Sequence, residues 1–119
     1  MVYHLIDIEN IPKKWVSIID GISSDDVLIL FILKENHNVY LNIDDVKKIV
    51  DKKIELNIID CFKGKAKKNA LDFQLVSYLG YLIHTDSENG IRIYTNDTGF
   101  DPVIDFWKDK GINIEKIGF

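Results

Sequence analysis

Five polar residues in three separate segments are of the types that bind a hard metal ion or activate water. Asp7 and Asn10 fall in LIDIEN, Asp72 falls in KNALDFQL, and Asp97 and Asp101 fall in IYTNDTGFD. Carboxylates that meet in a small cleft repel one another unless a cation lies among them. Oxygen ligands without histidine or cysteine favour Mg²⁺ or Mn²⁺ over zinc. Such a metal suits phosphodiester hydrolysis, because it polarises the phosphate and activates water.

Apolar runs rich in β-branched residues alternate with helical patterns along the chain. We predict strands at 2–8, 27–33, 54–62, 91–95 and 112–117, and helices near 12–20, 42–52, 69–84 and 101–110. This alternation predicts right-handed crossovers and a three-layer α/β/α sandwich with a central parallel sheet of about five strands. The unbroken VLILFIL run is typical of a strand buried on both faces, whereas the mixed IELNII run indicates an edge strand.

The predicted sheet brings the acidic residues to one rim. In an open parallel sheet, the carboxyl ends of the strands and the starts of the following helices share the edge at which ligands bind. Asp7 and Asp97 end strands, while Asp72 and Asp101 open helices. Asp72 also heads the apolar face of its helix, which continues through Leu75, Val76, Leu79 and Ile83. The four carboxylates are therefore predicted to converge.

A lysine-rich segment, KGKAKK at 63–68, leads directly into the helix that carries Asp72. We expect Lys65, Lys67 and Lys68 to contact the backbone of a nucleic-acid strand at the cleft. Contacts with phosphates position a substrate without specifying its sequence. A solvated loop is the alternative interpretation of this segment.

Each acidic residue also has a purely local alternative. Asp72 could complete a capping box with Asn69, and Asp101 before Pro102 has the pattern of a helix N-cap. The Asn-Asp-Thr-Gly segment at 96–99 is common in turns. Asp7 is the hardest to explain in this way, because an ionisable residue at the end of a buried strand is costly.

Length and composition indicate one globular domain spanning residues 1–119. Hydrophobic residues make up 46% of the chain and charged residues 29%, which is the ordinary balance of a globular protein. The single cysteine, Cys61, excludes an internal disulfide, and neither a secretory signal nor a membrane-spanning run is visible. We therefore expect a cytoplasmic protein with no membrane partner. The formal charge of −4 argues against general affinity for nucleic acids.

The segments LIDIEN, ALDFQLVSYLGYLI and TNDTGFDPVIDFW together resemble the PIN-like superfamily, and most closely its NYN-type branch. That branch combines an early Asp-x-x-Asn, a helical Asp and a late Ser/Thr-Asn-Asp-x-Gly-Phe-Asp. The resemblance covers nearly the whole chain in the right order. It implies a Rossmann-like domain and a metal-dependent endoribonuclease that uses Mg²⁺ or Mn²⁺ on RNA, expected to be single-stranded.

The same resemblance implies roles for individual residues. Asp7, Asp72 and Asp97 would be the metal-binding acids, and Asp101 an auxiliary acid. Asn10 matches the asparagine of the first motif, while Thr95 and Asn96 would shape the acidic turn. Glu9 departs from the family pattern, in which small residues are common at this position.

The acidic balance argues against strong independent affinity for RNA. Together with the expected single domain, it favours an RNA that is already bound or is delivered by a partner, as in a toxin or defence system. A homodimer or a partner protein stays open.

Two other functions fit part of the pattern. A signalling receiver domain could use Asp7, Asp60, Thr95 and Lys116, but it requires adjacent acids after the first strand and leaves Asp72 without a role. A PIN-like module that binds without catalysing is the second alternative, because a fold alone never establishes a function. Metal binding without RNA cleavage would indicate such a module.

Overall fold

A parallel sheet forms the centre of the protein in this computed structural model, which describes residues 1–36, 38–65 and 68–119. Its five strands among these residues are β1 (Val2–Asp7), β2 (Val27–Leu33), β3 (Glu55–Cys61), β4 (Gly90–Tyr94) and β5 (Ile114–Ile117). The strands lie in the order β3-β2-β1-β4-β5, and all neighbouring pairs are parallel. The predicted parallel sheet is confirmed.

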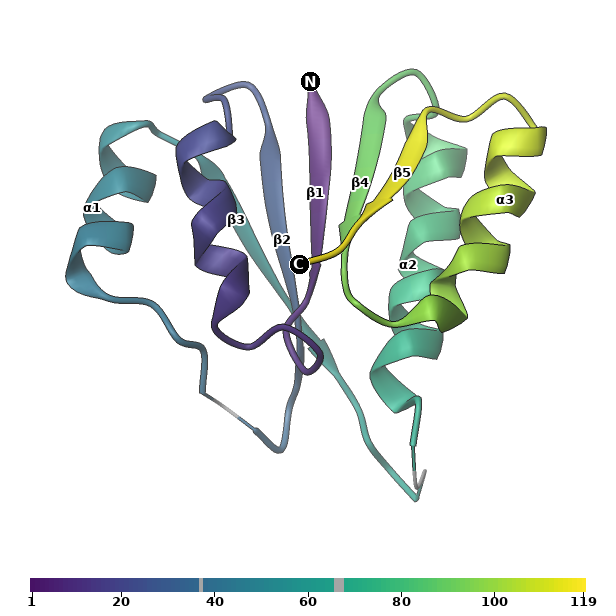
Figure 1. Ribbon diagram of the computed structural model, residues 1–119, viewed down its shortest axis with the longest axis horizontal. Helices are drawn as coiled ribbons and strands as arrows, with labels where there is room; N and C mark the ends of the chain where they lie inside the picture. The colour runs from purple at the N-terminus through teal and green to yellow at the C-terminus, as the bar shows by residue number, and fades with distance from the viewer. Residues whose placement is uncertain (37, 66–67) are drawn as a thin grey trace.

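Helices cover both faces of this sheet. In chain order they are the 3-10 helix η1 (Lys14–Gly21), α1 (Ile43–Asp51), α2 (Ala70–Thr85), the 3-10 helix η2 (Thr98–Phe100) and α3 (Asp101–Asp109). Figure 1 shows η1 and α1 on one side of the strands and α2 and α3 on the other. Each side has its own buried core, to which α2 contributes Leu75 and Leu79 and η1 contributes Trp15 and Ile19. This confirms the three-layer α/β/α sandwich.

The burial of individual strands follows their composition. β2, the apolar VLILFIL run, pairs with β1 and β3 and is buried along its length except at Leu33, which is partly buried. β3 lies at the edge, where Ile58 is 54% exposed. Both strands therefore have the positions that their sequences predict.

The strand order places a crevice beside the central strand. The chain runs outward from β1 through β2 to β3, returns through α2 to the opposite side of β1 as β4, and continues outward to β5. Such a reversal leaves room for a ligand beyond the carboxyl ends of the two strands that flank it. Asp7 ends β1 and Thr95 follows β4, so two predicted site segments meet there.

The same order contradicts the receiver-domain interpretation. Receiver domains have the flavodoxin-like order 2-1-3-4-5, which differs from the order found here. In addition, Asp60 is exposed on the edge strand, and the Lys116 ammonium pairs with the carboxylate of Asp101. The residues required for a receiver site are therefore not brought together.

Some elements differ in detail from the sequence prediction. The helix expected near 12–20 is wound as a 3-10 helix, and the Ser17 hydroxyl donates a hydrogen bond to the Lys14 carbonyl three residues earlier. The last strand begins at Ile114 rather than at residue 112, because Gly111 turns the chain with a φ of 85°. Across the described residues, every helix is too short or too polar to cross a membrane.

Candidate active site

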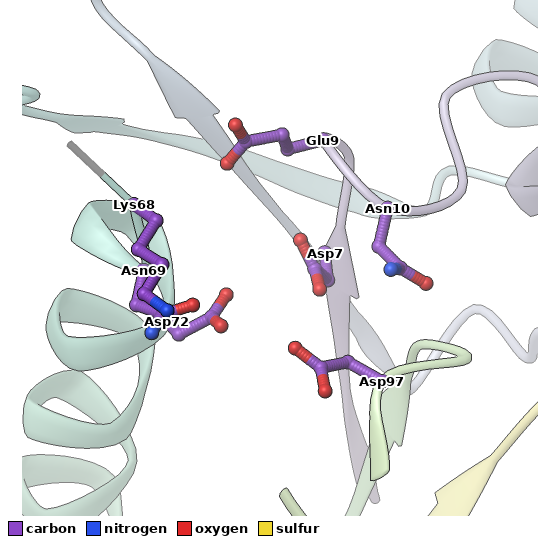
Figure 2. Close-up of a pocket in the computed structure, with 7 residues that line it drawn as sticks. All are labelled: Asp7, Glu9, Asn10, Lys68, Asn69, Asp72 and Asp97. Atoms are coloured by element: carbon purple, nitrogen blue, oxygen red, sulfur yellow. The ribbon is translucent and has the colours of Figure 1, made fainter. Parts of the chain in front are cut away.

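Three of the predicted acids line one pocket at the carboxyl ends of β1 and β4. The pocket has a volume of about 270 Å³, and its lining residues are Asp7, Glu9, Asn10, Lys68, Asn69, Asp72 and Asp97. Figure 2 shows the carboxylates of Asp7, Asp72 and Asp97 turned toward the same space, from β1, α2 and the segment after β4. Residues that are up to 90 positions apart are thus brought together.

Asp7 is the most buried of these acids. Its side chain points to the α2 face of the sheet, as Leu5 does two residues earlier, because side chains alternate along a strand. The residue is only 2% exposed, and its Oδ2 accepts a hydrogen bond of 2.9 Å from the Thr95 hydroxyl. The other oxygen, Oδ1, is buried and has no hydrogen-bond partner among the described residues. Burial raises the pKa of Asp7 to about 6, and the Asp72 carboxylate adds to this effect.

Asp72 lies in the first turn of α2, where its carboxylate is directed at the pocket. The capping-box interpretation is wrong, because Asn69 adopts a left-handed backbone with a φ of 63° and its side chain makes no cap hydrogen bond. Burial raises the pKa of Asp72 to about 6, and the adjacent Asp97 carboxylate raises it further. Asp72 is therefore a pocket residue rather than a helix cap.

Asp97 is held in a tight turn after β4. Its Oδ1 accepts a hydrogen bond of 2.8 Å from the Gly99 N–H, and its own N–H donates to the Thr95 hydroxyl at 3.1 Å. A side chain at Gly99 would bring its Cβ to 3.1 Å from this same Oδ1, so the turn favours glycine. Thr95 is fully buried and touches both acids. Its hydroxyl joins the end of β1 to the turn that carries Asp97.

Asn10 and Asn96 tie the rim loops together. The Asn10 Oδ1 accepts a hydrogen bond of 2.7 Å from the Asn96 N–H, while the Asn96 Oδ1 accepts one of 2.7 Å from the Phe119 N–H. Figure 2 shows the amide nitrogen of Asn10 on the side of Asp7. The NH₂ group of Asn10 therefore faces the pocket. The Asn96 side chain instead binds the backbone of Phe119 and does not line the pocket.

Asp101 does not line the pocket, although its position on the rim was predicted correctly. Its Oδ1 pairs with the Lys116 ammonium at 2.6 Å, and the same ammonium donates to the Asp97 carbonyl at 3.4 Å. The predicted N-cap role is wrong, since Phe100 occupies the cap position of α3 and Asp101 is its first helical residue. Asp101 therefore binds Lys116, and Lys116 binds the backbone of the turn that carries Asp97.

The lysine-rich segment reaches the pocket through one described residue. Lys68 lines the pocket, whereas Lys65 is exposed and lies outside its lining. Lys67 falls outside the described residues. Sequence reasoning did not propose Glu9 or Asn69 as site residues, although both line the pocket. Asparagine adopts the left-handed backbone more readily than most residues, but the sequence alone does not show that Asn69 does so.

Comparison with known families places the sequence in a family. A family model described as a PIN domain matches residues 1–117. The chain belongs to the PIN domain family. PIN domains are generally nucleases that bind RNA and use Mg²⁺ or Mn²⁺. No curated protein and no solved structure matches the chain. The match is to the PIN domain in general, and the NYN-type assignment stays a prediction.

The donor set of this PIN domain fits a hard divalent cation. It consists of carboxylate oxygens, and the nearby Cys61 is buried with the pKa of its thiol raised to about 11. The unpartnered Oδ1 of Asp7 and the raised pKa values of Asp7 and Asp72 indicate carboxylates that lack a compensating charge. A bound cation would supply that charge.

The acids of the PIN domain are not gathered around one point. In the described part of the chain, no three Asp, Glu, His or Cys side chains lie close enough together to hold a metal ion as they stand. Asp7 is fixed by burial and by Thr95, whereas Asp72 and Asp97 are only partly buried. Binding an ion through all three would therefore require their carboxylates to come closer together.

Proposed function

We propose that this PIN domain is an endoribonuclease that hydrolyses phosphodiester bonds of single-stranded RNA with Mg²⁺ or Mn²⁺. The observation that supports this most is that Asp7, Asp72 and Asp97 line one pocket, in which the buried Asp7 Oδ1 has no partner among the described residues. A buried acid without such a partner is costly, and this cost is offset if the acid binds a cation. RNA is proposed as the substrate because PIN domains generally bind it.

In this proposal Asp7, Asp72 and Asp97 hold the metal, which polarises the scissile phosphate and lowers the pKa of water when bound. The Thr95 hydroxyl keeps Asp7 in one orientation. The Asn10 amide faces the pocket and can donate to a phosphate oxygen or orient the attacking water. Lys68 adds a positive charge at the pocket, where the RNA backbone would lie. Asp101 acts indirectly, by holding Lys116 against the acidic turn.

The test is cleavage of a labelled, mixed-sequence single-stranded RNA by the purified protein in Mn²⁺, with and without a chelator. Asp97→Asn should lower the cleavage rate at least about 100-fold, because loss of a ligand removes several kcal/mol of transition-state stabilisation. Asp105→Asn is the matched control, since Asp105 is exposed on α3 outside the pocket and its loss should leave the rate unchanged. A single-stranded DNA of the same sequence tests the choice of substrate.

A second candidate is a PIN module that binds metal and RNA without cleaving. It is favoured by the separation of the acids, since no three of them in the described residues are positioned to share an ion, and two of them could bind a cation without the full set of ligands proposed for cleavage. If Mn²⁺ raises the melting temperature of the protein but no RNA is cleaved, this second function replaces the first. Cleavage that survives both the chelator and Asp97→Asn would contradict the proposed site.

A further inference from the structure

An apolar groove adjoins the acidic pocket and shares three of its residues, Asn69, Asp72 and Asp97. The groove has a volume of about 320 Å³ and lies between α2 and the η2–α3 segment. Its other lining residues are Phe73, Val76, Gly99, Phe100 and Val103. The acidic pocket and the groove therefore form one continuous surface with two chemically different ends.

Phe73 gives the groove its most unusual feature. Its side chain directly follows Asp72 in α2 and is 72% exposed, whereas Phe100 in the same groove is 2% exposed. One aromatic ring thus belongs to the folded core and the other is presented to solvent beside a cluster of carboxylates. Burying an exposed phenyl ring against a ligand is favourable, because apolar surface is removed from water.

The acidic pocket and the apolar groove differ in their charged residues, and this difference indicates which part of a ligand each would bind. Lys68 lines the acidic pocket, while no lysine or arginine is among the described residues that line the groove. The pocket also carries four carboxylates, so a phosphate would be held there by Lys68 together with the divalent cation of the proposed function, and not in the groove. The groove is instead suited to a neutral, flat group joined to that phosphate by a short link.

We propose that the groove receives the nucleobase next to the scissile phosphate, with Phe73 stacking against its face. The inference rests on the proposed function and adds a base-binding subsite to it. Val76 and Val103 form apolar walls, and the Asn69 amide lies at the junction with the acidic pocket, where it can reach the edge of the base or the sugar. Every base has a flat face, so this contact contributes affinity with little sequence preference.

The experiment compares adenosine 5′-monophosphate with ribose 5-phosphate, which carry the same phosphate but differ in the base. Both are titrated by NMR in the presence of Mg²⁺ against the parent protein and three variants. Base stacking predicts that the nucleotide binds the parent about 5- to 100-fold more tightly than the sugar phosphate. Phe73→Ala should reduce this ratio at least about fivefold, and Phe73→Tyr should keep it, because a phenol ring also stacks.

Tyr81→Ala is the matched control, since Tyr81 is 61% exposed on the same helix but lies outside the groove. Neither compound contains a phosphodiester bond, so the result does not depend on whether the protein cleaves RNA. A preference for the nucleotide that Phe73→Ala abolishes supports the subsite even if the nuclease assay fails. Equal binding of the two compounds, no binding of the nucleotide, or a preference that survives Phe73→Ala overturns it and leaves the groove to another ligand, such as an apolar peptide.

Discussion

The hydroxyl of Thr95 connects two of the proposed metal ligands. It donates to the Asp7 Oδ2 at 2.9 Å and accepts from the Asp97 N–H at 3.1 Å, in a fully buried position. Replacement by valine keeps the shape of the side chain but removes both hydrogen bonds. The buried Asp7 carboxylate would then have lost its hydroxyl partner.

We expect Thr95→Val to lower the free energy of unfolding by about 1–3 kcal/mol, because buried polar groups are left unsatisfied. Thr95→Ser is the control, since serine retains the hydroxyl. Urea unfolding at neutral pH measures both variants. If the valine variant is as stable as the serine variant, the hydroxyl does not hold the site together.

The raised pKa of Asp7 makes the metal-free protein sensitive to pH. This pKa is about 6 in the folded protein, against an ordinary value of 3.8, chiefly because the carboxyl is buried. Between these values the folded state binds more protons than the unfolded state, so the free energy of unfolding falls as the pH rises. For Asp7 alone the fall is about 2 kcal/mol from pH 4 to pH 7. Asp72, whose pKa is also raised, acts in the same direction.

Unfolding by urea in the presence of a chelator, at a series of pH values from 4 to 7.5, measures this dependence. Asp7→Asn should make the curve flatter, because the titrating group is removed. A parent curve that is no steeper than the Asp7→Asn curve would contradict the assigned burial of Asp7, because groups of opposite effect such as Asp26, whose pKa is lowered, are common to both proteins.

At the scale of elements, the start of α2 is fastened to the end of β3 by one side chain. The Gln74 amide accepts from the Phe62 N–H at 2.7 Å and donates to the Phe62 carbonyl at 2.7 Å. It also donates to the Ala70 carbonyl at 2.8 Å. These three hydrogen bonds form a clamp between Phe62, where the lysine-rich loop begins, and the first turn of α2, which carries Asp72.

Loss of the clamp should loosen that loop while leaving the sheet intact. We expect Gln74→Leu to increase the rate of trypsin cleavage after Lys63 or Lys65 by about tenfold, because local opening becomes easier. Ser77→Ala on the same helix is the control, since the Ser77 hydroxyl bonds only within α2. Cleavage at an unchanged rate would show that the loop is held by other contacts.

The sequence was sufficient to predict the elements but not their arrangement. β-branched runs located all five strands, and the polar IELNII run correctly indicated the edge. The strand order depends on which side of the existing sheet each new strand is added to, and no local sequence pattern encodes that choice. The reversal between β1 and β4, which brings Asp7 beside Thr95, therefore became visible only in the structure.

Three of the four carboxylates predicted to converge line the pocket, whereas neither of the alternative cap roles is formed. Asp7, Asp72 and Asp97 converge because parallel strands end at one edge, a rule that needs only the order of elements. Caps depend instead on the conformation of individual residues and on distant partners. Asp101 pairs with Lys116, fifteen positions later, and the left-handed backbone of Asn69 removes it from the capping box.

At the scale of the whole molecule, an acidic protein must bind a polyanion such as RNA through a few positively charged side chains. The formal charge is −4, and the lysines that the sequence predicts to contact phosphates are Lys65, Lys67 and Lys68, of which Lys68 lines the pocket. Each phosphate neutralised on a single strand contributes about −0.7 to the slope of log affinity against log salt, so three contacts predict a slope of about −2. A strongly basic binding face would give a much steeper slope.

Lys68→Ala should make this slope shallower by about 0.7 and weaken binding equally for RNAs of different sequence, because phosphate contacts carry no sequence information. Fluorescence anisotropy at several salt concentrations measures both effects, with Asp97→Asn as the common background so that the RNA stays intact in Mg²⁺. Lys110→Ala is the control, because it removes the same charge outside the pocket: this ammonium lies 3.9 Å from the centre of the Phe106 ring on α3. A slope that Lys68→Ala leaves unchanged would place the RNA backbone elsewhere, and the acidic pocket would then have to bind its substrate without the lysine beside it.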